Sequence, residues 1–375
     1  MTGPEGSAPR TGPRSRVAFV DWLRLLAALQ MITGHTTDAV LADAERASAW
    51  FSVWTQIRGL TAPAFLLASG VSFGLASRLD DASAYAVLRA REGARRRRVV
   101  RSAWLVVLGT LLHALDAPWV VDVLQCVGAT LLALDLLVTL ALRADAVVGI
   151  AGVLALTILV SAPSVDAAIA PADHEGAARF VLGWVDRDGG SLFPLIPWAF
   201  YVLAGIAIGR LAIPRGARTE GSVVIARLAV AAIGCGVAAF VAEALFGAAD
   251  AHGWSSHPAV VLTRTAMVLL MAACLAALGT RWELPHFGGL AWGSTLAGET
   301  LVLYVAHLLV LFADGVGPGR VWAHALLLPA TIALSIAMVI GSAIAALAWA
   351  RFWPPIEARW MPWLRPGRGP AKTGA

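Results

Sequence analysis

Three ionisable side chains share one stripe of the first long apolar segment, and their types could support anion binding and acid–base chemistry. Asp21, Arg24 and His35 follow helical steps of three and four residues, so a helix over 18–40 places them on one face. A guanidinium forks onto phosphate oxygens, and a neutral imidazole takes a proton from an attacking hydroxyl or amine. The eleven residues from Arg24 to His35 span about 17 Å of helix, so the stripe joins two depths of one segment.

A structural interpretation of this stripe is equally open at this point. Arg24 would extend to lipid headgroups beside its counter-ion Asp21, and His35 would hydrogen bond inside a helix bundle. An ionisable side chain inside a membrane costs at least about 3 kcal/mol unless it faces protein or water. Such residues are therefore the default functional candidates.

Other polar side chains also fall in apolar segments and suggest a lined cavity. Arg58 stands at the outer start of the second predicted span, and Arg264 on the outer half of the eighth. For Arg264, extension toward water and contact with an anionic or polyhydroxy substrate are equally supported. His307, in the middle of the ninth span, is more readily explained as a histidine that joins helices than as a catalytic one. The remaining candidates are His113, Asp116 and Glu299.

Membrane-spanning helices are the elements that must position these side chains. Of the 375 residues, 58% are hydrophobic and 14% are charged, against about a quarter charged in a soluble domain. The apolar runs show no alternation of period two, which favours helices over barrel strands. We predict an all-α, polytopic membrane protein with about ten transmembrane helices, and an eleventh, re-entrant segment stays open. The predicted spans are 18–40, 56–78, 101–117, 120–142, 145–165, 191–212, 221–246, 258–280, 291–313 and 324–350.

Basic residues predict the orientation of these spans. Arginines concentrate in the N-terminal tail, in 89–101, in the later even-numbered loops and at the C-terminus, which places both termini in the cytoplasm. The domains expected are a disordered cytoplasmic tail over 1–16, one transmembrane domain over 17–352 and a basic cytoplasmic tail over 353–375. The charges Asp21 and Arg24 argue against a cleaved signal peptide, so we expect the first segment to be retained. The Ala, Arg and Gly bias suggests a bacterial inner membrane.

Composition and motifs also limit the partners. The basic loops account for the net charge of +5, so membrane lipids are expected partners and nucleic acid is not. Cys126, Cys235 and Cys274 lie in apolar runs without paired spacing, which indicates neither a disulfide framework nor a metal site. A Walker loop, a GxSxG elbow and an HExxH pair are all missing from the sequence. The oligomeric state stays open, a homodimer included.

The order of several motifs resembles the transmembrane acyltransferase superfamily, in particular the bacterial branch related to heparan-α-glucosaminide N-acetyltransferases and, more distantly, to acyltransferase-3 enzymes. The resemblance runs through most of the chain. It rests on Arg24 and His35 with ten residues between them, on the basic run before GTLLHA, and on four longer segments. These are APAFLLASGVS, VLQCVGATLL, FPLIPWAFYVLAGIAIGR and GETLVLYVAHLLVL.

The resemblance implies that an acyl group, usually acetyl, passes from cytoplasmic acyl-CoA (acetyl-CoA) to a sugar hydroxyl or amine at the opposite face, in a glycan or glycolipid of the envelope. Arg24, with Asp21 beside it, would then bind acyl-CoA, and His35 would be catalytic. Part of the superfamily has Asn at this place and a catalytic His in the next outer loop. The loop 36–50 holds no histidine here, which favours His35, with Asp38 as an orienting carboxylate.

Arg58, Arg264 and His307 are the candidates for binding the acceptor. A transporter or flippase with buried His and Arg residues is the alternative function. A transporter would more often show inverted repeats and helices broken in mid-membrane, and the sequence shows no clear pair.

Overall fold

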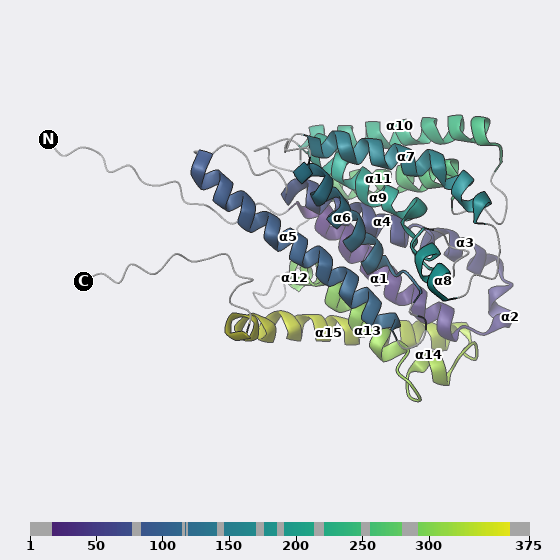
Figure 1. The fold of residues 1–375 in the computed structure, drawn as a ribbon. Helices are drawn as coiled ribbons and strands as arrows, with labels where there is room; N and C mark the ends of the chain where they lie inside the picture. Colours follow the sequence, from purple (N-terminus) through teal and green to yellow (C-terminus); the bar gives the residue numbers. More distant parts are fainter. Residues whose placement is uncertain are drawn as a thin grey trace, which may run out of the picture.

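The computed structural model describes residues 17–76, 84–114, 117, 119–140, 146–169, 176–185, 191–213, 221–248, 256–279 and 292–360. These residues form fifteen helices (Figure 1) and an isolated bridge between Leu41 and Leu326. The helices are α1 Ala18–Val40, α2 Asp43–Arg46, α3 Ala49–Arg58, α4 Thr61–Ala76, α5 Ala84–His113, α6 Val123–Leu140, α7 Ala146–Ala168, α8 Gly176–Leu182, α9 Leu195–Leu211, α10 Ser222–Phe246, α11 Pro258–Gly279, α12 Trp292–Gly298, α13 Thr300–Leu311, α14 Pro318–Val321 and α15 Leu328–Trp360.

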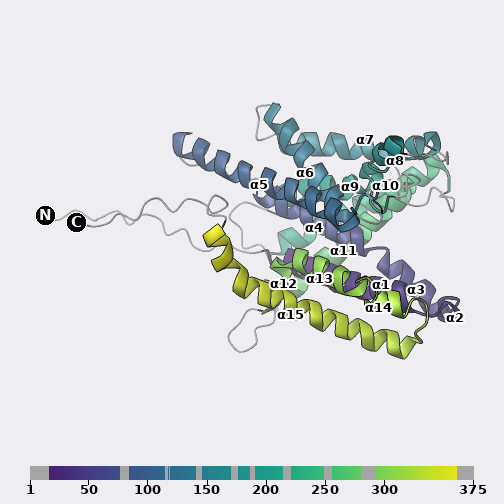
Figure 2. The same cartoon turned by 60° about the horizontal axis from the view of Figure 1, so that its bottom comes forward.

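Helix α1 is the central element of the bundle. It packs against α4, α11, α13 and α15 (Figures 1 and 2). Two faces of α1 are buried in two separate apolar clusters, one containing Phe19 and Leu23 and the other containing Leu25 and Ile32. Because its apolar residues pack on both sides, the polar stripe of α1 is held in a fixed direction within the bundle.

Glycines set the close packing of α4 against α9. Gly70 and Gly74 on α4 face Gly205 and Gly209 on α9, both pairs at a spacing of four residues. A Cβ at Gly74 would lie 2.6 Å from the carbonyl oxygen of Ile206, so only glycine allows the two backbones to approach this closely. Small residues four apart commonly pack membrane helices in this way.

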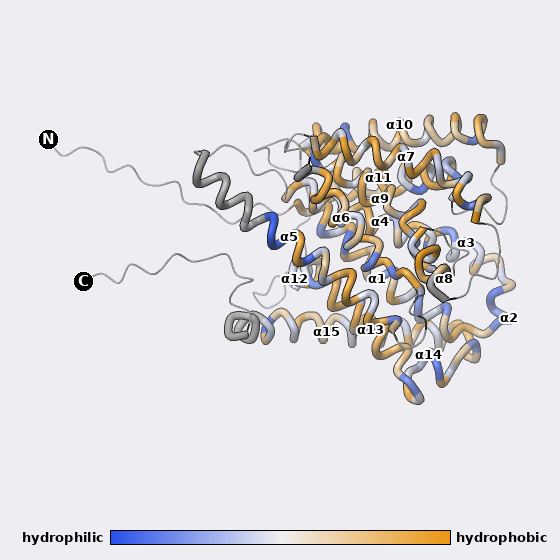
Figure 3. Tube along the Cα trace, in the orientation of Figure 1, coloured by the Kyte–Doolittle hydropathy of each residue, from blue (hydrophilic) through white to orange (hydrophobic). Residues whose placement is uncertain are grey.

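Five helices of the described chain are long and apolar enough to cross a membrane, and the bent pair α12–α13 would make a sixth. The five are Ala49–Ala76, Ala146–Ala168, Ser222–Phe246, Pro258–Gly279 and Leu328–Trp353. Apolar colour dominates these helices in Figure 3, and α10 leaves Phe240 75% exposed, as a lipid-facing side chain would be. The protein is therefore a helical membrane protein.

The expected count of about ten spans is not confirmed. Each of the ten predicted ranges overlaps a helix, but several of these helices are too short or too polar to qualify, and Val123–Leu137 and Leu195–Leu211 are among the shorter apolar ones. Helix α1 is also not among the qualifying spans, and its charged stripe lowers its apolar character.

The predicted tails lie largely outside the described residues, as does Asp116. Helix α15 continues to Trp360, so its last turns enter the range 353–375 expected to be a tail. The basic run belongs to α5, on which Arg95 and Arg96 are exposed.

Candidate functional site

Two histidines meet in the interior of the bundle, one from α1 and one from α13. His35 Nδ1 lies 2.9 Å from His307 Nε2, and the rings are stacked with centroids 5.2 Å apart. His307 is fully buried, and its Nδ1 lies 2.9 Å from the carbonyl oxygen of Leu303, four residues earlier on the same helix. A carbonyl only accepts, so His307 Nδ1 carries the hydrogen and its Nε2, when neutral, offers a lone pair.

This arrangement fixes the tautomer of His35. His307 Nε2 accepts, so His35 Nδ1 must donate, which leaves the lone pair of neutral His35 on Nε2. Within the described residues, His35 Nε2 has no hydrogen-bond partner, and the side chain is only partly buried. A half-buried imidazole with an accessible lone pair is suited to accept a proton from a bound substrate.

An ion pair lies one turn along α1 from His35. The Asp38 carboxylate pairs with the Arg58 guanidinium from the end of α3, with their side chains 39% and 30% exposed. Arg58 also lies against Gly34, where a Cβ would come 3.0 Å from its Cδ. Gly34 therefore leaves the room that brings an arginine beside His35.

The structure shows which side chains Asp38 and His35 contact. We expected Asp38 to orient His35, but the hydrogen bond at His35 Nδ1 is made by His307 instead. In the described chain, Asp38 uses its carboxylate for Arg58. His307, expected to bind the acceptor, lies behind His35 rather than on an open surface.

A buried carboxylate anchors the helix that carries His307. The Tyr304 hydroxyl donates to Asp122, with Oδ1 at 2.5 Å and Oδ2 at 2.6 Å, and both residues are almost fully buried. His113 from α5 lies 3.4 Å from Asp122 Oδ2, and the Tyr304 ring makes an edge contact with His307 at 5.7 Å. Together these contacts tie α5, the start of α6 and α13 to the histidine pair.

Asp122 and Tyr304 were missed as site residues. The spacing of Tyr304 and His307 on one helix face was a usable signal, because three residues bring side chains to the same side. Asp122 was harder to recognise from the sequence, since it precedes its apolar helix and resembles a loop residue.

The second polar centre of α1 lies at a break in another helix. Arg24 Nη2 donates to Thr300 Oγ1 at 3.1 Å, and Arg24 also acts electrostatically on Glu299. Thr300 begins α13 directly after Glu299, where α12 and α13 meet at an angle of 75°. Asp21 lies in the first turn of α1, three residues before Arg24. Helices α1 and α13 each contribute residues both to this centre and to the histidine pair.

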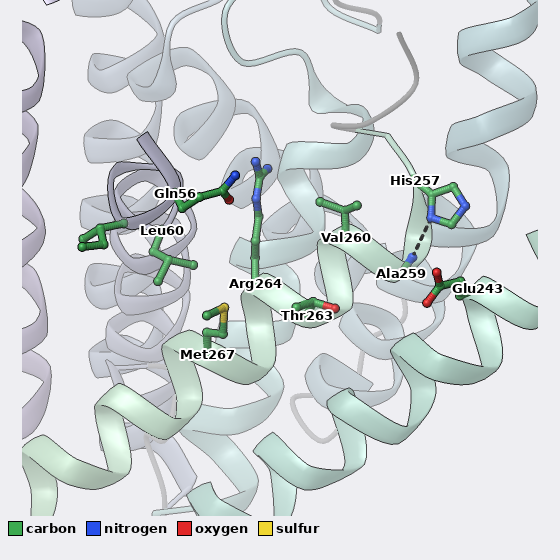
Figure 4. A pocket seen from close by; sticks show the side chains of 10 residues that line it. Gln56, Leu60, Glu243, His257, Ala259, Val260, Thr263, Arg264 and Met267 are labelled. Atoms are coloured by element: carbon green, nitrogen blue, oxygen red, sulfur yellow. Dashed lines mark hydrogen bonds between the residues drawn. The ribbon is translucent and has the colours of Figure 1, made fainter. Parts of the chain in front are cut away.

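Arg264 lies apart from the histidine pair, in a pocket of about 330 Å³ between α3, α10 and α11 (Figure 4). Its side chain is 8% exposed, and its Nη2 would lie 3.7 Å from a Cβ at Gly59, the residue that follows Arg58. Gln56, Glu243 and His257 also line this pocket. Arg264 therefore lies close to the end of α3 that carries Arg58, but it lines a pocket to which neither Arg58 nor His307 contributes.

In the described ranges, His, Cys, Asp and Glu side chains form no group of three that could hold a metal ion. The residues that come together instead are those of proton-transfer and anion-binding chemistry.

The family of the chain follows from a comparison with known proteins. A family model described as heparan-α-glucosaminide N-acetyltransferase, catalytic, matches residues 16–237. The match contains Arg24, His35, Asp38, Arg58 and Asp122, whereas His307 and Arg264 lie beyond its end. No curated protein matches the chain significantly. With a match over more than half of its length, the chain belongs to the family of heparan-α-glucosaminide N-acetyltransferase catalytic domains.

Proposed function

We propose that this membrane acetyltransferase moves an acetyl group from cytoplasmic acetyl-CoA to a sugar hydroxyl or amine of an envelope or secreted glycan on the opposite side, with His35 as general base. The family supplies the reaction type and acetyl-CoA as the usual donor. The hydrogen bond from His35 Nδ1 to His307 Nε2 is the observation that carries the assignment of His35, since it leaves Nε2 as the basic atom.

The proposed reaction needs one proton carrier. His35 Nε2 takes the proton of the acceptor hydroxyl or amine while its oxygen or nitrogen attacks the thioester carbonyl. The carbon–sulfur bond then breaks, and the imidazolium returns the proton to the CoA thiolate. Because the proton taken from the acceptor ends on CoA, the histidine is neutral again after each turnover.

Arg24 is the proposed contact for the anionic part of the donor. A guanidinium forms bidentate hydrogen bonds with phosphate oxygens. Thr300 accepts a hydrogen bond from one nitrogen of the Arg24 guanidinium. The eleven residues of α1 between Arg24 and His35 correspond to about 17 Å. An extended acyl-CoA would keep its phosphates at Arg24 and reach His35 with its thioester.

Arg58 is the best placed candidate for contact with the acceptor. Its alkyl chain lies against Gly34, next to His35 in sequence, and its half-buried guanidinium pairs with Asp38, one turn from His35. A cation there would also stabilise the negative charge that develops on the thioester oxygen.

A transporter or flippase is the second candidate. The 75° break between α12 and α13 favours it, because transporters bind substrates at discontinuous membrane helices. The same break has an explanation in the first proposal, since Arg24 reaches the start of α13 at this point.

The two candidates are separated by incubating membrane vesicles with labelled acetyl-CoA and a panel of glycans. We expect label transfer by the wild type, loss of transfer in His35→Ala and weaker donor binding in Arg24→Ala. His324→Asn is the matched control, because the His324 side chain is half exposed and pairs with Asp43 rather than with His35, His307 or Arg58. Unchanged transfer in His35→Ala would refute its catalytic role, and absence of acetyl-CoA binding would favour transport.

A further inference from the structure

The pocket around Arg264 lies between three candidate membrane-spanning segments, near the end of α10 and the start of α11. Its walls come from Ala49–Ala76, Ser222–Phe246 and Pro258–Gly279, all of which are long and apolar enough to cross the bilayer. Arg264 comes six residues after the start of α11, and Glu243 three residues before the end of α10, depths of about 9 and 5 Å along the helices. Headgroups occupy the outer 5–8 Å or so on each side of the hydrocarbon. Glu243 therefore lies at headgroup level, and Arg264 lies deeper, at the outer margin of the hydrocarbon, from which a long arginine side chain can extend to the headgroups.

The polarity of the pocket changes with depth. Figure 4 shows His257 and Glu243 at one side of the pocket, Val260 and Thr263 in the middle, and Arg264 with Gln56 toward the other side. The apolar side chains Leu60 and Met267 lie further along, and Met267 is about 14 Å from the start of α11. This order, from charged to apolar, matches a lipid molecule rather than a fully water-soluble one.

The polar groups supply particular hydrogen-bonding atoms. The backbone N–H of Ala259 donates to His257 Nδ1 at 3.2 Å, so His257 Nε2 carries the hydrogen. The Nε2–H of His257 is buried and has no hydrogen-bond partner within the described residues, and the His257 residue is only 8% exposed. A buried donor without a partner is destabilising, and an acceptor atom of a bound ligand would satisfy it. Arg264 adds a buried cation, and the exposed Glu243 adds an anion at the mouth.

We propose that this pocket binds one phospholipid with an amine-bearing headgroup. The phosphate lies at Arg264, the ammonium group lies at Glu243, and an acyl chain follows Leu60 and Met267. His257 donates its free N–H to a headgroup or glycerol-ester oxygen. The proposal goes beyond acetyl transfer, and seven of the ten pocket residues lie beyond residue 237, where the family match ends.

The test is equilibrium lipid binding to the purified full chain in micelles, with bound lipids counted by native mass spectrometry. The probes are phosphatidylethanolamine, phosphatidylglycerol and diacylglycerol with identical chains, together with water-soluble phosphoethanolamine. We expect phosphatidylethanolamine to bind at least about tenfold more tightly than diacylglycerol, because a charge-assisted contact is worth about a decade in affinity. Binding that is equal for these two lipids, or retained by phosphoethanolamine alone, would overturn the proposal.

Variants locate the site. Arg264→Gln should weaken phosphatidylethanolamine at least about tenfold, and Arg264→Lys should retain most of the affinity because the charge stays. Glu243→Gln should remove the preference for phosphatidylethanolamine over phosphatidylglycerol. Arg320→Gln is the control, since it removes an arginine that is half exposed outside the pocket and paired with Asp314. Equal losses in Arg320→Gln and Arg264→Gln would contradict a specific pocket. No step of this test depends on catalysis, so it stands apart from the acetyltransferase assay.

Discussion

His307 offers the sharpest test of how the site works, because it touches His35 and does not face the substrate. In His307→Ala, His35 Nδ1 loses its acceptor, and the ring is free to exchange tautomers and rotate. Removing one partner of a buried hydrogen bond costs about 1–3 kcal/mol. If the whole of this free energy is needed to hold His35 in its productive orientation, the turnover number falls about 5- to 150-fold. The loss should be smaller than in His35→Ala, where the general base itself contributes about 10²- to 10⁴-fold.

A double-mutant cycle distinguishes positioning from an independent role. If His307 acts through His35, the variant His35→Ala/His307→Ala should be no slower than His35→Ala alone. His307→Gln should recover part of the rate, because its amide oxygen can accept from His35 Nδ1. The assay is acetyl transfer under saturating acetyl-CoA, with ¹⁵N chemical shifts of the histidine ring reporting the tautomer. Additive losses in the double variant would refute the positioning role.

Three further changes test other parts of the account. Arg24→Ala should raise the KM for acetyl-CoA about tenfold or more with a smaller change in kcat, measured by donor titration, because a charge-assisted phosphate contact is lost; an unchanged KM would remove Arg24 from the donor site. Tyr304→Phe should destabilise the protein by about 1–3 kcal/mol in thermal unfolding, since Asp122 loses its buried donor; an unchanged Tm would show that this bond does not anchor α13. Gly205→Val should reduce the yield of folded protein, because its Cβ would meet the backbone carbonyl of Leu67. The yield is measured by size-exclusion chromatography, and a variant that elutes as well-folded protein would contradict the close packing of α4 against α9.

The boundaries of uninterrupted helices were predictable from sequence. Ranges 18–40 and 258–280 agree closely with Ala18–Val40 and Pro258–Gly279, because polar or charged loops limit an apolar run. Breaks inside apolar runs were not predictable. The break at Glu299 interrupts a segment whose composition gives little sign of a corner.

The polar stripe of α1 was predictable from the sequence, but the contacts of its residues were not. The stripe of Arg24 and His35 follows from helical periodicity, which is a local property. The pairing of His35 with His307 joins residues 272 apart, and a single sequence holds no signal for such a contact. For the same reason Asp38 was expected at the ring nitrogen that His307 in fact contacts.

Transfer across a sealed bilayer tests the central claim most directly. The protein is reconstituted in one orientation, with labelled acetyl-CoA confined to the side of Arg24 and an acceptor glycan confined to the side of His35. We predict that label appears on the acceptor, that His35→Ala abolishes it and that His324→Asn does not. Transfer only when donor and acceptor share one side, or transfer unchanged in His35→Ala, would contradict the account.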